Sequence, residues 1–326
     1  RTGGAWGYTE MDFREWKGTE RMFEIVAERI CEMMVILLIG VAVYRLGIID
    51  ETASKRLSDL LLTVVAPLLL FQSYQTDFDL ELFYGLLEVA GASLLISAVG
   101  IFAAKFLFPG RDDRGRVEKM AAIYSNCGFI GIPLVDGILG SRGVFYMTAY
   151  LTVFNVLFWT HGLSIMDRRG ESGGAWKKIF NPSVIGILLG LVCFVARIRL
   201  PEVLLSPITL IGNMNTPLAM MIAGISLARG DIRHSLKNKR LYLLTLTRLV
   251  AYPLMGLLIL WPLHLEFTMA FTIFVGTACP MAAATILFAQ RYGGDARYAT
   301  ELFVVTTALS AVTIPLLSIP ATWLLQ

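Results

Sequence analysis

The sequence predicts an all-α membrane protein with ten transmembrane helices arranged as two inverted five-helix repeats. Three observations lead to this fold class. The chain of 326 residues is 56% hydrophobic and only 16% charged, which lies outside the usual composition of soluble domains. Its mean hydropathy is +0.66. Two long apolar runs, in corresponding places of the two halves, are interrupted by glycine, small polar residues and proline.

A helix that crosses a bilayer needs about 20 largely apolar residues. Ten such runs occupy residues 27–46, 57–75, 82–107, 118–138, 143–166, 181–199, 203–228, 240–262, 267–290 and 297–325. The fourth and seventh are the least apolar, because glycine and asparagine dilute them. Residues 1–21 are interpreted as an N-terminal extension, native or added for expression, and are left out of the fold.

The runs divide into two repeats, residues 22–166 and 181–326, joined by a linker at 167–180. Weak self-similarity supports this division: residues 35–40 resemble residues 185–190, and residues 66–68 resemble residues 216–218. Five spans per repeat is an odd number. The second repeat must therefore enter the membrane from the opposite side, which makes the repeats inverted.

The distribution of positive charge predicts the orientation. The connections that follow odd-numbered runs hold nineteen Lys and Arg residues, whereas the remaining connections hold only Arg142, Arg197 and Arg199. Because Lys and Arg are retained on the cytoplasmic side of a cell membrane, the linker is expected in the cytoplasm. Both termini are expected on the extracytoplasmic side.

The fourth run contains the first interruption, Asn-Cys-Gly-Phe-Ile-Gly-Ile-Pro, which starts at Asn126. Proline has no N–H to donate, and Gly128 and Gly131 lower the cost of leaving helical dihedral angles. We expect the chain to unwind between Asn126 and Ile132 and to restart with Pro133 at the first helical position. A restarted helix offers N–H groups and a positive dipole end to an anion. The alternative is a proline kink satisfied by neighbouring helices.

The ninth run contains the second interruption, in which Thr277 is the polar residue and Pro280 is expected to restart the helix. If the two interruptions cross in mid-membrane, their helix N-termini face one another and favour an anionic substrate. Cys279 lies at this candidate site, although a packing role suits its thiol better than a ligand role. The four cysteines and three histidines are too scattered for a metal site, so no metal is predicted.

Other polar residues within the runs have two interpretations. Asn213 and Asn215 in the seventh run, and Asn155 in the fifth, either line a water-filled cavity or hydrogen-bond between helices. Arg248 either compensates the charge of a substrate or extends to the lipid headgroups. Glu301 is a candidate for proton or cation coupling.

Several motifs together resemble the auxin efflux carrier family of membrane transporters, in its prokaryotic branch. The motifs lie in order at residues 125–134, 181–186, 212–219, 276–295 and 306–310, and the resemblance runs from about Met22 to the C-terminus. It implies two inverted five-helix repeats, a scaffold, and crossed broken helices four and nine, as in bile-acid/sodium symporters and sodium/proton antiporters.

The resemblance also implies residue roles and a function. The crossover prolines correspond to Pro133 and Pro280, and the substrate-binding asparagine corresponds to Asn126. Relatives often have Thr where this chain has Cys127, and Met where it has Cys279, so the residues beside both interruptions depart from the family pattern. The implied activity is elevator-type transport of organic acids such as malate, malonate or auxin-like acids.

We therefore expect a secondary active transporter of small organic anions, with coupling to H⁺ or Na⁺ left open. The sequence shows neither a nucleophile–base pair nor a metal-hydrolase or phosphate-loop motif, which argues against an enzyme. A transporter-like channel or sensor of organic acids is the alternative. The expected partners are the substrate and the lipid bilayer. No cofactor and no nucleic acid is expected, and a homodimer is left open.

Overall fold

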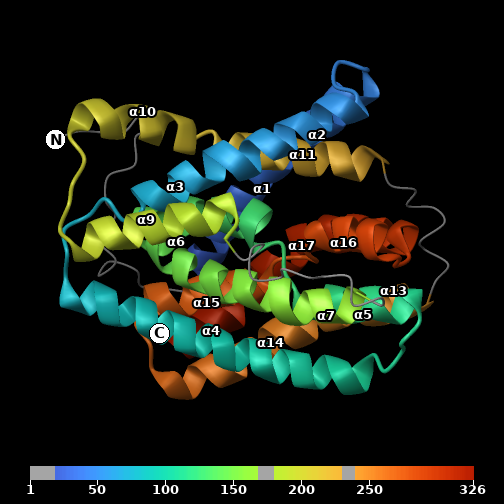
Figure 1. The fold of residues 1–326 in the computed structure, drawn as a ribbon. Coiled ribbons are helices and arrows are strands. Elements are labelled where there is room, and N and C mark those ends of the chain that lie inside the picture. The colour runs from blue at the N-terminus through green and yellow to red at the C-terminus, as the bar shows by residue number, and fades with distance from the viewer. Residues whose placement is uncertain (1–18, 168–179, 230–238) are drawn as a thin grey trace.

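The computed structural model describes residues 19–167, 180–229 and 239–326, and this part of the chain is helical (Figure 1). The first half contains α1 (Thr19–Arg45), α2 (Glu51–Leu60), α3 (Ala66–Gln72), α4 (Leu80–Leu107), α5 (Asp113–Ile123), α6 (Ile132–Leu157) and α7 (Leu163–Met166). The second half contains α9 (Pro182–Val195), α10 (Glu202–Gly212), α11 (Asn215–Arg229), α13 (Lys239–Leu246), α14 (Tyr252–Leu260), α15 (Phe267–Ala278), α16 (Ala284–Tyr292) and α17 (Ala296–Leu325).

Wider π-helical turns join some of these helices into longer rods. They are η2 (Leu61–Val65), η3 (Cys127–Gly131), η4 (Phe158–Gly162) and η5 (Thr247–Ala251), and a short 3₁₀ turn, η6 (Trp261–Leu263), follows α14. Most of the predicted extension at 1–21 and of the predicted linker at 167–180 lies outside the described residues. The repeat boundaries stay a prediction.

Five helical stretches are long and apolar enough to cross a membrane. They are Leu80–Leu107, Cys127–Met166, Glu202–Arg229, Lys239–Leu263 and Ala296–Leu325. Two shorter apolar helices, α9 and α15, accompany them. Helical residues occupy each of the ten predicted runs, while the number of crossings stays a prediction.

One predicted connection and one predicted run can be compared with the helices in detail. The connection expected at residues 139–142 coincides with a kink at Gly140, whose non-helical φ of 63° and ψ of −157° suit glycine, so α6 consists of two helices that meet at this kink. The seventh run was expected to be one helix, but it is interrupted at Asn213 and Met214, between α10 and α11. The polar run around these residues ends α10, and Asn215 begins α11.

Local sequence explains where several helices begin. The carboxylate of Asp50 accepts a 2.7 Å hydrogen bond from the N–H of Ala53 at the start of α2. The amide oxygen of Asn181 accepts from the N–H of Val184 at the start of α9, directly before Pro182. Such side chains satisfy N–H groups that have no partner within the helix.

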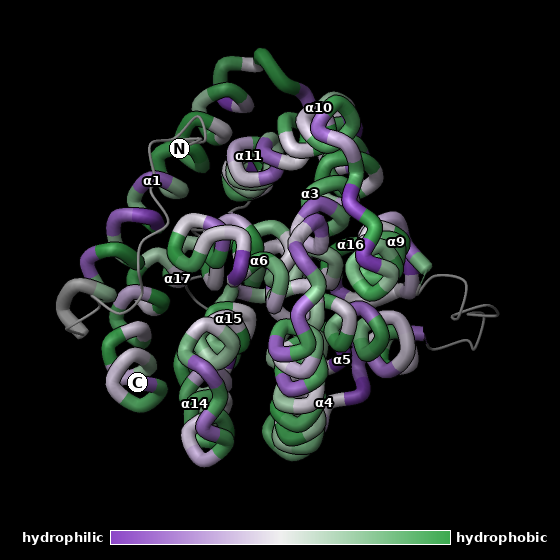
Figure 2. Tube along the Cα trace, turned by 90° about the vertical axis from the view of Figure 1, so that its left-hand side faces the viewer, coloured by the Kyte–Doolittle hydropathy of each residue, from purple (hydrophilic) through white to green (hydrophobic). Residues whose placement is uncertain are grey.

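The helices form one bundle (Figures 1 and 2), which is described here as two groups that touch where α1 packs along α17. One group, here called the scaffold group, contains α1, α2, α3, α9, α10 and α11, and the other, the crossing group, contains α4–α7 and α13–α17. Within the scaffold group α1 packs along α11, and α9 packs along α3. Backbones touch at both contacts, because a Cβ on Gly224 would overlap the carbonyl oxygen of Leu37 and one on Gly186 would overlap that of Pro67. Such close approach is typical of membrane helix pairs.

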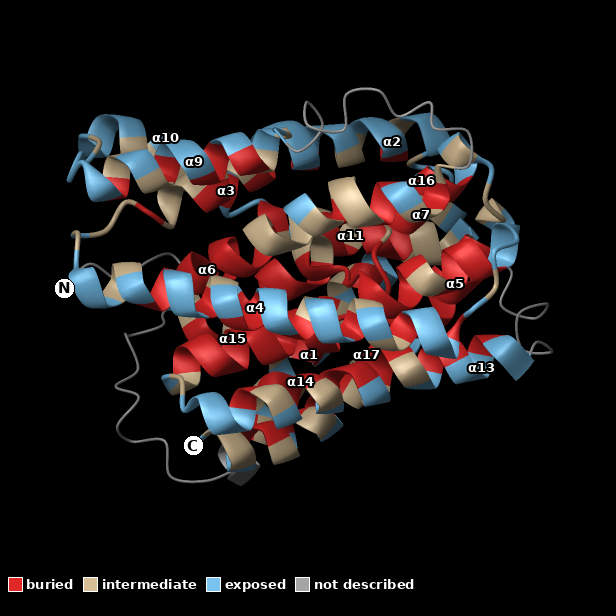
Figure 3. Cartoon of the chain, turned by 60° about the horizontal axis from the view of Figure 1, so that its bottom comes forward, coloured by how far each residue is buried: buried red, intermediate tan, exposed pale blue. Residues whose placement is uncertain are grey.

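Burial follows the position of the helices. The central helices α6, α15 and α17 are largely buried, whereas outer helices such as α4 expose one side (Figure 3). The exposed side of α4 is apolar: Leu87, Leu94, Phe102 and Phe106 are each more than half exposed. Apolar side chains on an outer surface fit contact with lipid.

The glycine contact between α1 and α11 predicts a large effect of one methyl group. Gly224→Ala should lower the free energy of unfolding by about 1–3 kcal/mol, because the new Cβ forces the two backbones apart. Gly91→Ala in α4 is the matched control, since a Cβ there meets no atom within 4 Å. Thermal unfolding in detergent measures both. Equal stability of the two variants would show that the contact is not tight.

Candidate functional site

Two helices of the crossing group are interrupted near their middle. After α5 ends at Ile123, residues 124–126 leave the helix, and the chain resumes with η3 and α6. After α15 ends at Ala278, residues 279–283 leave the helix, and α16 begins at Ala284. The first expected restart point is correct for the α-helix, since α6 begins at Ile132 with Pro133 in its first turn, but a π-helical turn already begins at Cys127. The second expected restart point was wrong, because α16 begins at Ala284, after Pro280.

The shift at the first interruption comes from the π-helical turn. Within η3 the N–H of Ile132 binds the carbonyl of Cys127, five residues back. This wider turn changes the hydrogen-bond register directly before Pro133, so the proline is accommodated near the start of α6 without breaking it. Both Gly131 and Pro133 are buried there. A Cβ on Gly131 would lie 3.3 Å from the sulfur of Cys279, so this glycine brings the two interrupted helices together.

The shift at the second interruption comes from pairing between the two extended stretches. Ser125 and Met281 form an isolated antiparallel β-bridge. The N–H of Asn126 donates to the carbonyl of Pro280 at 2.7 Å, and the N–H of Ala282 donates to that of Tyr124 at 2.9 Å. These bonds hold residues 279–282 extended and delay the start of α16. The two interruptions thus meet as two short extended segments joined by this bridge, here called the crossing.

Arg248 binds the carbonyl ends of both interrupted helices. Its side chain is completely buried. It donates two hydrogen bonds to the carbonyl of Cys279, at 2.8 and 3.0 Å, and one of 2.6 Å to that of Thr277. It also donates to the carbonyls of Ala122 and Ile123, at 3.2 and 3.3 Å. These hydrogen bonds reach backbone carbonyls at two negative dipole ends.

The N-terminal side of the crossing has free polar groups and space. The side chain of Asn126 is buried, and its amide nitrogen has no hydrogen-bond partner in the described structure. Gly128 lies in the first turn of the resumed helix, where a Cβ would meet no atom within 4 Å. Thr277 and Cys279 contribute mainly backbone groups, since the hydroxyl of Thr277 donates to the carbonyl of Phe274.

Three predicted asparagines lie on other elements. The amide of Asn155 donates to the carbonyl of Leu151 and accepts from the amide of Asn181, so it ties α6 to the start of α9. Asn213 is exposed between α10 and α11. Asn215 is 2% exposed, and its amide nitrogen has no hydrogen-bond partner among the described atoms.

Glu301 lies away from the crossing, near the start of α17. Its carboxylate forms a 3.4 Å ion pair with Arg297, one turn earlier. It is 8% exposed. Its coupling role stays a prediction.

Sequence reasoning missed side chains that support the crossing. Tyr150, from α6, lies with its hydroxyl 3.3 Å from that of Ser125, and its ring fills the space beside Gly276. The hydroxyl of Thr306, from α17, accepts a weak 3.4 Å hydrogen bond from the N–H of Met281. A tyrosine and a threonine inside apolar runs give no signal that distinguishes them from packing residues.

The apolar helices and the crossing define a multi-pass membrane protein with an internal polar site. Residues 25–318 match the model of a family described as "Membrane transport protein". The chain therefore belongs to this family, which confirms the resemblance to auxin efflux carriers.

Two archaeal relatives carry similar descriptions. An "uncharacterized transporter" of Methanothermobacter thermautotrophicus is 25% identical over 304 residues, which cover 90% of this chain and 97% of the relative. The "uncharacterized transporter MJ1031" of Methanocaldococcus jannaschii is 21% identical over 294 residues, which cover 87% and 95%. These descriptions indicate a membrane transporter rather than an enzyme.

The hydrogen bonds of Arg248 predict a structural effect of its removal. Arg248→Gln should lower the free energy of unfolding by at least about 3 kcal/mol, because buried carbonyl groups lose a charged donor. Arg248→Lys should lower the free energy of unfolding by less, because lysine keeps the positive charge but lacks the planar guanidinium that donates to several carbonyls at once. Thermal unfolding followed by circular dichroism measures both. A glutamine variant as stable as the parent protein would contradict this role.

Proposed function

We propose that this protein is a secondary active transporter of small organic anions and that it binds the substrate carboxylate at the N-terminal side of the crossing. One observation carries the proposal: the guanidinium of Arg248 is bonded to the carbonyl ends of both interrupted helices. The negative dipole ends are thereby compensated. The positive ends at Cys127 and Ala284 have no equivalent side chain among their described cap contacts.

The local chemistry favours a carboxylate at this place. A helix N-terminus presents N–H groups and a partial positive charge to an anion. The unpaired amide of Asn126 adds a neutral donor beside the first turn, and the space next to Gly128 leaves room for a ligand. Donors without a full charge bind an anion weakly enough to release it, which suits transport.

The inverted repeat is part of the same proposal. The first predicted span (α1) packs on the seventh (α11), and the sixth (α9) packs on the second (α3). An inverted repeat requires both contacts. When the two repeats are interchanged, the first span corresponds to the sixth and the seventh to the second, so the first contact becomes the second. Ten crossings with both termini on the extracytoplasmic side fit the charge distribution.

We further propose that the crossing group moves against the scaffold group to give alternating access. Side-chain hydrogen bonds that join the groups include Asn181 with Asn155 and Tyr74 with Thr148. A motion of whole groups leaves the bonds within the crossing intact. The coupling ion, H⁺ or Na⁺, stays a prediction.

Flux measurements test the proposed function. Purified protein in proteoliposomes should show saturable flux of labelled malate, malonate or an indole acid. Asn126→Ala should raise KM at least about ten-fold, because it removes one hydrogen bond to a charged group. Thermal stability should stay near that of the parent protein, because the amide has no protein partner. Absence of saturable flux for every organic acid would overturn the function. Unchanged KM in the variant would overturn the site.

Two glycines of one helical turn give a sharper pair of variants. Gly128→Ala places a methyl group in open space beside the proposed carboxylate, so KM should rise while stability is equal or slightly higher. Gly131→Ala places its methyl 2.7 Å from the terminal carbon of the completely buried Met147 and 3.3 Å from the sulfur of Cys279, at the contact between the two interrupted helices, and should lower stability. Flux and thermal unfolding measured on both variants separate the effects. If Gly128→Ala leaves KM unchanged, the substrate does not bind beside this turn.

A further inference from the structure

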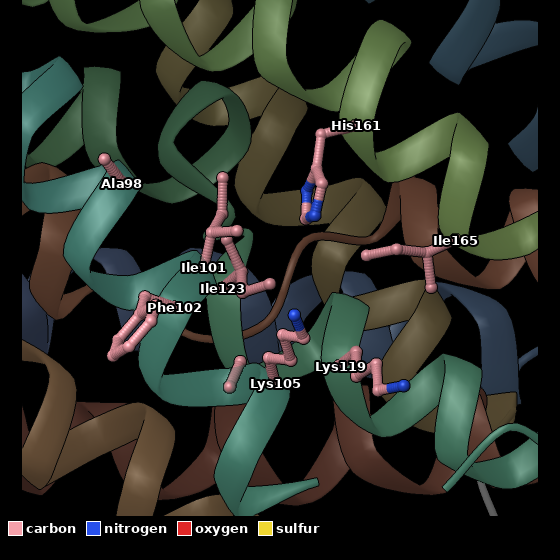
Figure 4. A pocket seen from close by; sticks show the side chains of 9 residues that line it. Ala98, Ile101, Phe102, Lys105, Lys119, Ile123, His161 and Ile165 are labelled. Atoms are coloured by element: carbon pink, nitrogen blue, oxygen red, sulfur yellow. The ribbon is translucent and has the colours of Figure 1, made fainter. Parts of the chain in front are cut away.

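A cavity of about 470 Å³ lies between α4, α5 and the η4–α7 segment, in the crossing group (Figure 4). Most of the side chains that line it are apolar, among them Ile101, Phe102, Ile123 and Ile165. Phe102 is 65% exposed and forms an edge-to-face pair with the exposed Phe106. The cavity therefore opens on the apolar outer side of α4, where lipid chains lie.

Three basic side chains line the same cavity. They are Lys105 in the last turn of α4, Lys119 on α5 and His161 in η4. The amine of Lys105 and the ring of His161 point into the space between them (Figure 4). None of the described residues that line the cavity is acidic. Within the described part of the chain, neither lysine has a carboxylate in ion-pair distance.

An apolar cavity with cations at one end suits an amphipathic anion. A soluble carboxylate would make no contact with the apolar side chains of the cavity. A lipid can contact them with an acyl chain and place its phosphate near the lysine amines. Basic pockets between membrane helices on the Lys/Arg-rich side are known to suit anionic lipid headgroups. Lys105 lies at the end of α4, followed by Arg111 and Arg114, so the cavity lies at the correct depth for a headgroup.

We propose that this cavity binds an anionic phospholipid from the leaflet next to the Lys/Arg-rich loops. The phosphate lies between Lys105 and Lys119, and part of one acyl chain lies along Ile101, Phe102 and Ile165. The rest of the lipid stays in the bilayer.

The position of the cavity links the lipid to the crossing. Ile123 lines the cavity, and its carbonyl accepts a hydrogen bond from Arg248. His161 lies with its Nδ1 atom 2.9 Å from the hydroxyl of Tyr124, whose carbonyl pairs with Ala282 in the crossing. The cavity is thus lined by a residue that lies three positions before Asn126 of the proposed substrate site.

Native mass spectrometry of the full chain, in mixed micelles of phosphatidylglycerol and phosphatidylcholine, tests the proposal. The parent protein should retain phosphatidylglycerol preferentially. Lys105→Gln/Lys119→Gln should weaken that binding about 30-fold, because each lysine near an anionic lipid contributes about a five-fold factor. The matched control is Lys55→Gln/Lys239→Gln, which removes the same charge from exposed positions outside the cavity and should leave binding unchanged.

Two further measurements identify the ligand. Phe102→Ala should weaken phosphatidylglycerol binding without loss of thermal stability, because the exposed ring contacts the acyl chain. Glycerol phosphate and malate should not displace the lipid. Equal retention of the two lipids, equal loss in both double variants, or displacement by a soluble anion would each overturn the proposal.

Discussion

The crossing depends on one interaction, the binding of the Arg248 guanidinium to the carbonyl ends of α5 and α15. A helix that stops inside a bilayer leaves carbonyl groups without partners and without water. Here two helices stop close together, so their exposed carbonyls and negative dipole ends repel each other. A buried cation between them removes both costs, and the dipole ends in turn compensate the desolvated cation. The β-bridge between Ser125 and Met281 satisfies part of the remaining backbone.

This arrangement makes the crossing electrically asymmetric. The carbonyl side has a full positive charge that is shared among backbone oxygens, whereas the N–H side has only partial charges and the amide of Asn126. In the proposed mechanism, a bound anion would find donors on the N–H side without meeting a strong ion-pair partner. Because Arg248 is completely buried, it acts on the site through the backbone it positions. It is a positioning residue in the proposed mechanism.

Local chemistry predicted where the helices are interrupted but could not predict how. Proline and glycine disturb a helix within a few residues of themselves, so the sequence around Asn126 and Pro280 was sufficient to locate both interruptions. The restart points depend on the π-helical turn and the β-bridge, and the bridge pairs residues more than 150 positions apart. The partners of Arg248 lie up to 126 residues away. A single sequence contains no signal for such contacts, and for the same reason Asn155 could not be assigned to Asn181.

The distribution of tight contacts indicates which parts of the molecule behave as rigid bodies. Backbone contacts at Gly224 and Gly186 fix α1 to α11 and α9 to α3, and they leave no space for sliding. Arg248 and the β-bridge hold the two interrupted helices together in the crossing. Between the two groups, the side-chain hydrogen bonds of Asn181 and Tyr74 each contribute only about 1 kcal/mol, and α1 also packs along α17. The proposed motion of the groups would therefore have to exchange apolar packing contacts as well as these hydrogen bonds, and it would carry the crossing with its geometry preserved.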